Sequence, residues 1–402
     1  VPLPELGGPG GCPDVSLLGV RLPMQGAGVG ERVVVDWAAS PWMLLAGMPG
    51  SGKTVTLNCL LAQQICAGAR VAVVDERSKA VDFAWAKEFV MPGGWGCDSE
   101  AHAVATLAMV YREGQRRAQR LSDLGHVSWV DMPPGERFEP VFVVVDEAAA
   151  LLVADPVPKG LPKDHPLVAE VTSLNFHRAL IGRYINRIVA EQRFVGVRMV
   201  ISNQVTNQAT GLPPSLRSKI GHRILQGTNP SRSARAQTFN DEQSVPTVPQ
   251  HVKASGDRAR GVGLCDLEGQ APAVYKAMFA DPADYRRRLL ELGVRTTDRP
   301  APTAAQVAAF SMLADPFEPE STTGTPVSFG AAGWETGEDG QPLSGLARAN
   351  AARHALGRRT RASGGQLEPF GARAGEVVAS QGSRCGSCGG WVHPQTGVCG
   401  CS

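Results

Sequence analysis

The sequence predicts an α/β protein with a mainly parallel sheet that helices cover on both faces. Three short apolar runs have the length and composition of buried strands. These runs are residues 42–46, 69–75 and 140–145. A helical apolar pattern ends near Gly68, and a second helix, capped by Ser99, is expected to run to about Leu124 and to stop at Gly125. Strands that alternate with helices are typical of parallel sheets.

The first strand leads into a glycine-rich turn with the G-x4-G-K-[ST] spacing of a phosphate-binding loop, or P-loop. Its residues are Gly47, Met48, Pro49, Gly50, Ser51, Gly52, Lys53 and Thr54. In such a loop the glycines let successive N–H groups surround a phosphate at a helix N-terminus. Lys53 is then expected to reach the β- and γ-phosphates of ATP, and the Thr54 hydroxyl to ligate Mg²⁺. The alternative is a glycine loop with an incidental lysine, which the strand before it and the helix after it disfavour.

The third strand ends in two carboxylates, Asp146 and Glu147. Ligands of parallel sheets bind outside the carboxyl ends of the strands. Asp146 is therefore expected to hold Mg²⁺ through water, and Glu147 to polarise the attacking water. The alternative is the acidic first turn of a helix. The position of the pair, about ninety residues after the P-loop, favours the catalytic interpretation.

A further strand ends in amides. A helix expected from Leu174 to about Phe194 leads into an apolar strand over residues 196–204. At its end Gln204, with Asn203 as a second candidate, is expected to hydrogen-bond nucleotide and water and so to sense phosphate loss. The alternative role is capping of loop backbone. Later strands are expected at residues 221–226, 261–265 and 273–278.

The composition indicates a reducing compartment. The 402 residues allow two or three domains. Five of the nine cysteines are scattered, unlike a disulfide framework, and neither a signal peptide nor a run of eighteen apolar residues is present, so we expect a cytoplasmic protein. The net charge of +2 hides an uneven distribution and says little about partners. The chain begins with Val1 rather than Met, which leaves a missing N-terminal anchor open.

Five segments, in this order along the chain, carry a resemblance to a known family. They are residues 35–47, 74–83, 144–147, 192–204 and 231–232. Together they resemble the FtsK/SpoIIIE-type DNA translocases, and within that group the plasmid-transfer (Tra) proteins of mycelial bacteria. The resemblance covers about residues 16–280. It implies a RecA-like P-loop NTPase core that assembles as a ring, usually a homo-hexamer, around double-stranded DNA and moves along it by hydrolysing ATP.

The resemblance also implies that an arginine of one subunit completes the ATP site of a neighbouring subunit. Arg232 is preferred from its family position, and Arg193 and Arg223 are the other candidates. Two departures stand out: residues 202–206 read Ser-Asn-Gln-Val-Thr where the family commonly has Ala-Thr-Gln-Arg-Pro, and Glu76-Arg77 replaces a usual Pro-Lys. Many relatives are anchored at a septum or membrane, so peripheral attachment through partners stays open for this chain.

Two other functions fit the same motifs. One is another RecA-like motor, such as a conjugative coupling ATPase or a packaging motor that acts on DNA or protein. The other is a DNA-binding or septum-associated adaptor that uses ATP only to assemble. Duplex-stimulated hydrolysis, and its dependence on Glu147, would separate these functions from a translocase of plasmid or chromosomal DNA.

Beyond residue 280 the composition changes. Asp281 and Thr303 have the pattern of helix caps, and an acidic stretch is followed by an arginine-rich one that either grips DNA phosphates or forms a solvated helix. The expected parts are a flexible lead-in (1–15), the ATPase motor (16–280), a short helical extension (281–313), a flexible, partly disordered acidic linker (314–345), a basic segment (346–380) and a zinc-knuckle-like end (381–402).

The C-terminal end has the cysteine spacing of a small zinc site. Its candidate ligands are Cys385, Cys388, Cys399 and Cys401. Such pairs can close four thiolates around Zn²⁺, and metal binding would supply the folding energy that so short a segment lacks. The second pair is tighter than usual, so His393 could replace one sulfur; the alternative is free thiols in a disordered tail. The expected role is docking of DNA or a partner.

Overall fold

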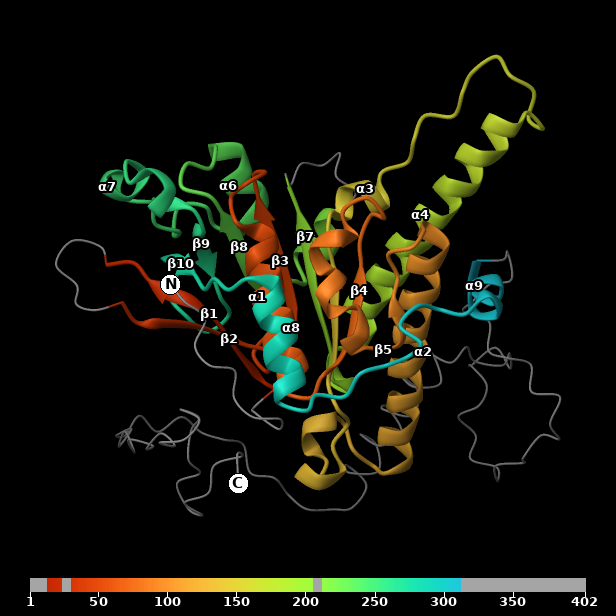
Figure 1. The fold of residues 1–402 in the computed structure, drawn as a ribbon, viewed down its shortest axis with the longest axis horizontal. Coiled ribbons are helices and arrows are strands. Elements are labelled where there is room, and N and C mark those ends of the chain that lie inside the picture. Colours follow the sequence, from red (N-terminus) through yellow and green to blue (C-terminus); the bar gives the residue numbers. More distant parts are fainter. Residues whose placement is uncertain (1–12, 24–29, 205–211, 312–402) are drawn as a thin grey trace, which may run out of the picture. The chain divides into compact units, whose positions relative to one another are not determined.

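The computed structural model describes residues 13–23, 30–204 and 212–311 and has the expected α/β architecture (Figure 1). In this part of the chain one ten-stranded sheet has the order β2-β1-β10-β9-β8-β3-β7-β6-β4-β5. The six strands from β8 to β5 are parallel. The other four strands pair antiparallel, with one another and, through β9, with β8. The mainly parallel sheet of the prediction is thus the half that carries the motifs.

The strands are β1 (Val15–Arg21), β2 (Arg32–Asp36), β3 (Trp42–Gly47), β4 (Arg70–Val74), β5 (Val90–Trp95), β6 (Val141–Val145), β7 (Val197–Asn203), β8 (His222–Gln226), β9 (Val262–Asp266) and β10 (Ala273–Ala277). The α-helices are α1 (Lys53–Cys66), α2 (Glu100–Asp123), α3 (Ala148–Leu152), α4 (Pro166–Glu191), α5 (Pro214–Arg217), α6 (Arg232–Thr238), α7 (Gln250–Lys253), α8 (Pro282–Glu291) and α9 (Ala304–Ser311). Short 3-10 helices are η1 (Ala80–Phe89), η2 (Trp129–Asp131), η3 (Pro134–Glu136), η4 (Arg193–Val195) and η6 (Gly256–Ala259).

Helices cover both faces of the parallel half. Helix α1 packs on β3, β4 and β6, and α8 packs on α1 and η1. Helix α2 packs on β4 and β5 from the other side and lies along α4 (Figure 1). Because side chains of a strand alternate between faces, Met43 and Leu45 of β3 point into the α1 side of the core while Leu44 belongs to the opposite face. Both faces of β3 are therefore buried.

Several predicted elements are confirmed with their caps. The Ser99 hydroxyl accepts a hydrogen bond from the His102 N–H at the start of α2. The Asp281 carboxylate accepts from the Ala283 N–H at the start of α8. Thr303 and Gln306 form a capping box at the start of α9: the Thr303 N–H donates to Gln306 Oε1, and the Gln306 N–H donates to Thr303 Oγ1.

Two expectations about element boundaries were wrong, and one strand was not expected. Helix α4 begins at Pro166 rather than near Leu174, because Pro166 is suited to a first helical position and the His165 ring caps the turn. Strand β5 was not expected because its sequence contains proline and glycines, which an edge strand tolerates. The lead-in was expected to reach residue 15, but Val15 already belongs to β1 and Asp14 forms an ion pair with buried Arg198.

Other predictions fall outside the described residues. These are the acidic linker (314–345), the basic segment (346–380) and the zinc candidates Cys385, Cys388, Cys399 and Cys401. In the part that is described, Cys59, Cys66, Cys97 and Cys265 are buried and form no disulfide. None of the helices described there combines the length and the apolar composition that a membrane span requires.

Candidate functional site

The P-loop joins β3 to α1 with the geometry of an anion site. Gly50 and Gly52 have φ angles of 74° and 98°, in the left-handed region that favours glycine. Gly52 caps α1 without a side-chain hydrogen bond, and no acidic residue lies in the first turn. The first N–H groups of α1 are therefore available to an anion, and the helix dipole favours negative charge there.

Close packing around the P-loop explains its first glycine. A Cβ atom on Gly47 would lie 2.7 Å from Ser51 Oγ and 2.8 Å from Gln226 Cβ, both shorter than a tolerated contact. The Ser51 Oγ atom is buried and has no hydrogen-bond partner in the described residues. An unpaired hydroxyl at this point is suited to a phosphate oxygen.

Lys53, Asp146 and Glu147 meet beside the P-loop, as the sequence predicted. The Lys53 ammonium lies 2.8 Å from Asp146 Oδ1 and 3.4 Å from Glu147 Oε2. Each of the three side chains is at most about a tenth exposed. The convergence follows from the sheet order, since β3 and β6 flank β7 and all three strands end at the same edge. Charges so poorly hydrated interact strongly.

The backbone of Glu147 is unusual. Its φ of 45° is the only positive φ of a non-glycine residue in the described ranges, and its N–H donates to Asp146 Oδ1 at 2.8 Å. Residues held in this region cost of order 1–3 kcal/mol and are concentrated at functional sites. The turn directs the Glu147 carboxylate toward Lys53 rather than along α3.

The residues present fit a magnesium ion that is bound together with nucleotide phosphates. Thr54 and Asp146 line the same cavity and offer oxygen ligands, and the Lys53 ammonium already occupies a cation position against Asp146. Among the described residues no group of three or more His, Cys, Asp or Glu side chains could hold a metal by itself. That is compatible with Mg²⁺, which is usually held by one or two carboxylates, substrate phosphates and water.

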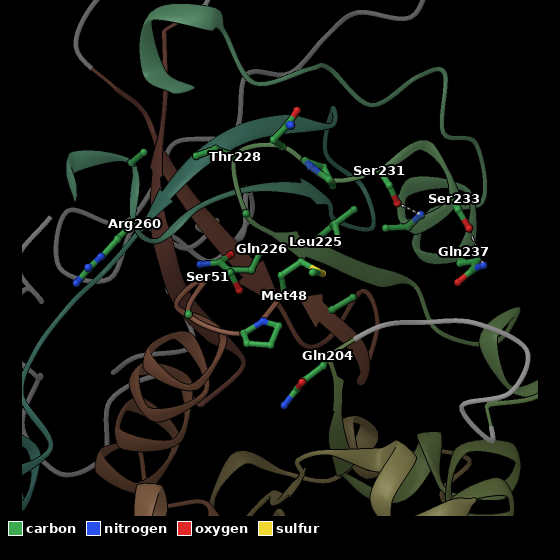
Figure 2. A pocket seen from close by; sticks show the side chains of 18 of the residues that line it. Met48, Ser51, Gln204, Leu225, Gln226, Thr228, Ser231, Ser233, Gln237 and Arg260 are labelled. Atoms are coloured by element: carbon green, nitrogen blue, oxygen red, sulfur yellow. Dashed lines mark hydrogen bonds between the residues drawn. The ribbon is translucent and has the colours of Figure 1, made fainter. Parts of the chain in front are cut away.

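Among the described residues the P-loop forms part of the wall of two cavities. One, of about 770 Å³, contains Lys53, Thr54, Asp146 and Glu147. The other, of about 610 Å³, lies over the ends of β3 and β8 and is lined by small residues of the segment from Gly227 to Ala234, several of them polar (Figure 2). The residues that line both are Met48, Pro49, Gly50, Gln204 and Arg260. Both volumes are in the range of small-molecule sites.

The amides at the end of β7 have separate roles. Gln204 lines both cavities, and Figure 2 shows it at the end of β7 near Met48 of the P-loop. The Asn203 side chain is buried, and its Oδ1 accepts from the Gln204 N–H at 3.0 Å. Asn203 therefore performs the backbone capping that was the alternative interpretation, while Gln204 remains the candidate for contact with nucleotide.

Asp75 and Lys79 also belong to the site, although the motifs did not indicate them. The Asp75 carboxylate is buried beside Asp146 because Val74 pairs with Val145, and its Oδ2 has no hydrogen-bond partner in the described residues. Burial, and then the charge of Asp146, raise the pKa of Asp75 to about 8. Lys79 Nζ lies 3.4 Å from Glu147 Oε2. Both residues lie in the segment 74–83, one of the five segments that carry the family resemblance, and this was the signal in the sequence that could have indicated them.

A buried hydrogen-bond chain fixes the opposite side of the P-loop helix. The Tyr275 hydroxyl donates to Gln226 Oε1 at 2.5 Å, and Gln226 Nε2 donates to Thr56 Oγ1 at 3.2 Å. The Gly261 N–H donates to the P-loop carbonyl of Ser51 at 3.2 Å. The antiparallel half of the sheet thus supports the P-loop, a role that the sequence did not indicate.

The three candidate arginines differ in environment. Arg232, at the start of α6, has a side chain that is 89% exposed and pairs with Glu242 at 3.2 Å, outside both cavities of this chain. Arg193 is exposed and donates to the Ala39 carbonyl. Arg223 is buried and donates to three backbone carbonyls, so it is a structural residue and is removed from the candidates.

Comparison with known proteins gives structural likeness without sequence likeness. No protein-family model and no curated protein sequence matches the chain. The structure is similar to the pCW3 conjugation coupling protein TcpA in a monomer form with ATPγS, with a TM-score of 0.53 and 20% identity over 70% of this chain and 71% of that chain. It is also similar to EssC (ATPases 2 and 3) from Geobacillus thermodenitrificans, with a TM-score of 0.51 and 12% identity over 73% of this chain. The match spans 50% of that EssC chain. The chain therefore shares the fold of these ATPases.

Proposed function

We propose that the protein is an ATP-driven motor that translocates double-stranded DNA. The observation that carries the proposal is the convergence of Lys53, Asp146 and Glu147 beside a P-loop whose helix N-terminus is free of side-chain caps. A buried lysine, a pair of carboxylates at a strand end and a polar amide on the strand between them are the parts that hydrolysis of a nucleoside triphosphate requires.

Each residue has a defined role in this proposal. Lys53 leaves the carboxylates and binds the β- and γ-phosphates of ATP, and the loop N–H groups hold the phosphate oxygens. Thr54 and Asp146 would hold Mg²⁺, which neutralises charge on the phosphates when it is bound. Glu147 accepts a proton from the attacking water and orients it, and Gln204 contacts the nucleotide from the end of β7. Arg232 of a neighbouring subunit supplies the remaining positive charge.

The choice of duplex DNA as the substrate rests on two supports. The motif order resembles FtsK/SpoIIIE-type translocases, and a conjugation coupling protein shares the fold. We propose a homo-hexameric ring in the cytoplasm, with peripheral attachment to a membrane or septal partner. The basic segment and a zinc site at Cys385, Cys388, Cys399 and Cys401 would add DNA contacts.

A second function has an observation in its favour. The fold is about as similar to the EssC ATPases as to the coupling protein, by TM-scores of 0.51 and 0.53. A RecA-like motor that moves another polymer, or an adaptor that only assembles with ATP, would keep the same P-loop. A motor of this kind is stimulated by its own substrate and not by duplex DNA.

Steady-state ATP hydrolysis with and without linear duplex DNA tests the proposal. We expect duplex DNA to stimulate the wild type more than single-stranded DNA does, and Lys53→Ala to abolish turnover. Glu147→Gln should lower kcat by roughly 100- to 10,000-fold while ATP binding persists, because only water activation is removed. Hydrolysis that ignores duplex DNA would refute translocation, and equal function of Glu147→Gln and wild type in a DNA-dependent assay would favour the adaptor.

A further inference from the structure

Among the described residues Glu147 has two cationic partners. Lys53 Nζ and Lys79 Nζ each lie 3.4 Å from Glu147 Oε2. Lys53 also pairs with Asp146, and its Nζ lies closer to Asp146 Oδ1, at 2.8 Å, than to Glu147. Lys79 pairs with Glu147 and comes from a different element, the turn after β4.

The turn that carries Lys79 is fastened to the P-loop helix. The Lys79 N–H donates to the Glu76 carbonyl at 2.9 Å, and the Asp82 N–H donates to the Lys79 carbonyl at 3.1 Å. Asn58 of α1 then donates to the Asp82 carbonyl at 3.1 Å and accepts from Trp85 Nε1 at 2.9 Å. Lys79 is therefore placed by the same helix that begins with Lys53.

The two lysines differ in what binding of ATP does to them. Lys53 is needed at the phosphates, so in the proposed function it must give up the Glu147 carboxylate. The Lys79 side chain is 40% exposed and lies at the cavity wall beside Asp82, whereas that of Lys53 is 9% exposed. Once Lys53 has moved, Lys79 is, among the described residues, the cation that remains paired with Glu147 Oε2.

We propose that Lys79 is a positioning residue for Glu147; this inference rests on the proposed function. Its ammonium remains on one carboxylate oxygen of Glu147 after Lys53 has transferred to the phosphates, and it keeps the other oxygen aligned with the attacking water. Alignment of this kind matters because a misplaced catalytic group loses rate even where its chemistry is intact. The strained backbone of Glu147 and the tethered turn of Lys79 hold the two ends of the pair.

Steady-state hydrolysis by the full chain with linear duplex DNA tests this role. Lys79→Met keeps the length of the side chain and removes its charge. It should lower kcat about tenfold, which is well short of the roughly 100-fold or greater loss expected from removing a general base, and should leave the KM for ATP unchanged. Lys79→Arg should restore most of kcat. The matched control is Lys87→Met, because Lys87 lies in η1, is 42% exposed, and pairs with Asp98 outside the site; it should keep wild-type kcat.

The double variant separates positioning from direct contact with phosphate. In a Glu147→Gln background Lys79→Met should cause no further loss of the residual rate, because groups that act as a unit are not additive. An equal loss in both backgrounds, or a raised KM together with weaker binding of ATPγS, would overturn the proposal in favour of a phosphate contact. Wild-type kcat in Lys79→Met would overturn it while the proposed function stands. Absence of hydrolysis in the wild type would overturn both.

Discussion

Asn58 joins the P-loop helix to the turn that carries Lys79, and its replacement should affect stability and turnover together. Asn58→Leu removes two hydrogen bonds from a side chain that is 4% exposed. The buried Trp85 N–H is left without a partner, which costs about 1–3 kcal/mol, and the lost bond to the carbonyl of exposed Asp82 adds roughly 1 kcal/mol. We therefore expect a loss of about 2–4 kcal/mol in the free energy of unfolding.

Urea denaturation of the nucleotide-free protein measures this loss. Gln119→Leu is the control, because its 2.8 Å bond to Asp123 is exposed and its removal should cost less than about 0.5 kcal/mol. Adding Trp85→Phe removes the orphaned donor, so the double variant should be more stable than the sum of the single losses predicts. Asn58→Leu should also lower kcat, because Lys79 is less firmly placed. A loss below about 0.5 kcal/mol for Asn58→Leu would show that the Asn58 bonds do not hold the turn.

Three further predictions address the P-loop, a buried carboxyl and the proposed subunit contact. In Gly47→Ala the new methyl group would lie 2.7 Å from Ser51 Oγ, so the KM for ATP should rise at least about tenfold. Gly135→Ala, which has open space around the new methyl group, should leave the hydrolysis kinetics unchanged, and equal kinetics of the two variants would contradict the reasoning. Because the pKa of Asp75 is raised to about 8, the folded protein keeps a proton that the unfolded chain loses above about pH 4. The free energy of unfolding should therefore fall by up to about 1.4 kcal/mol per pH unit as the pH rises from about 4 to about 8. Asp75→Asn should remove this slope in urea titrations, and an unchanged slope would refute the assignment. Arg232→Ala should reduce DNA-stimulated kcat by roughly 1,000-fold or more with nucleotide binding intact, while the exposed control Arg286→Ala keeps activity, and wild-type turnover in Arg232→Ala would exclude it as the arginine acting between subunits.

The sequence by itself determined the parts of this protein that depend on neighbours within a few residues. The strand, glycine turn and helix around Lys53 follow from local apolar patterning and from the φ angles that only glycine adopts easily. The caps at Ser99, Asp281 and Thr303 were predictable for the same reason, since a capping side chain reaches only two or three residues along the chain. Where local signals were mixed, as at the proline and glycines of β5, the prediction failed.

Tertiary structure decided which distant residues share the site. Lys53 and Asp146 could be paired in advance because the P-loop and an acidic strand end are typical partners, but Lys79 and Asp75 reach the site only because β4 lies beside β6 in the sheet. The support of the P-loop by Gln226 and Tyr275 likewise depends on the antiparallel strands that continue the sheet past β8. Strand order is set by the packing of whole faces and not by any local run of residues, so these contacts became visible only when the chain was folded.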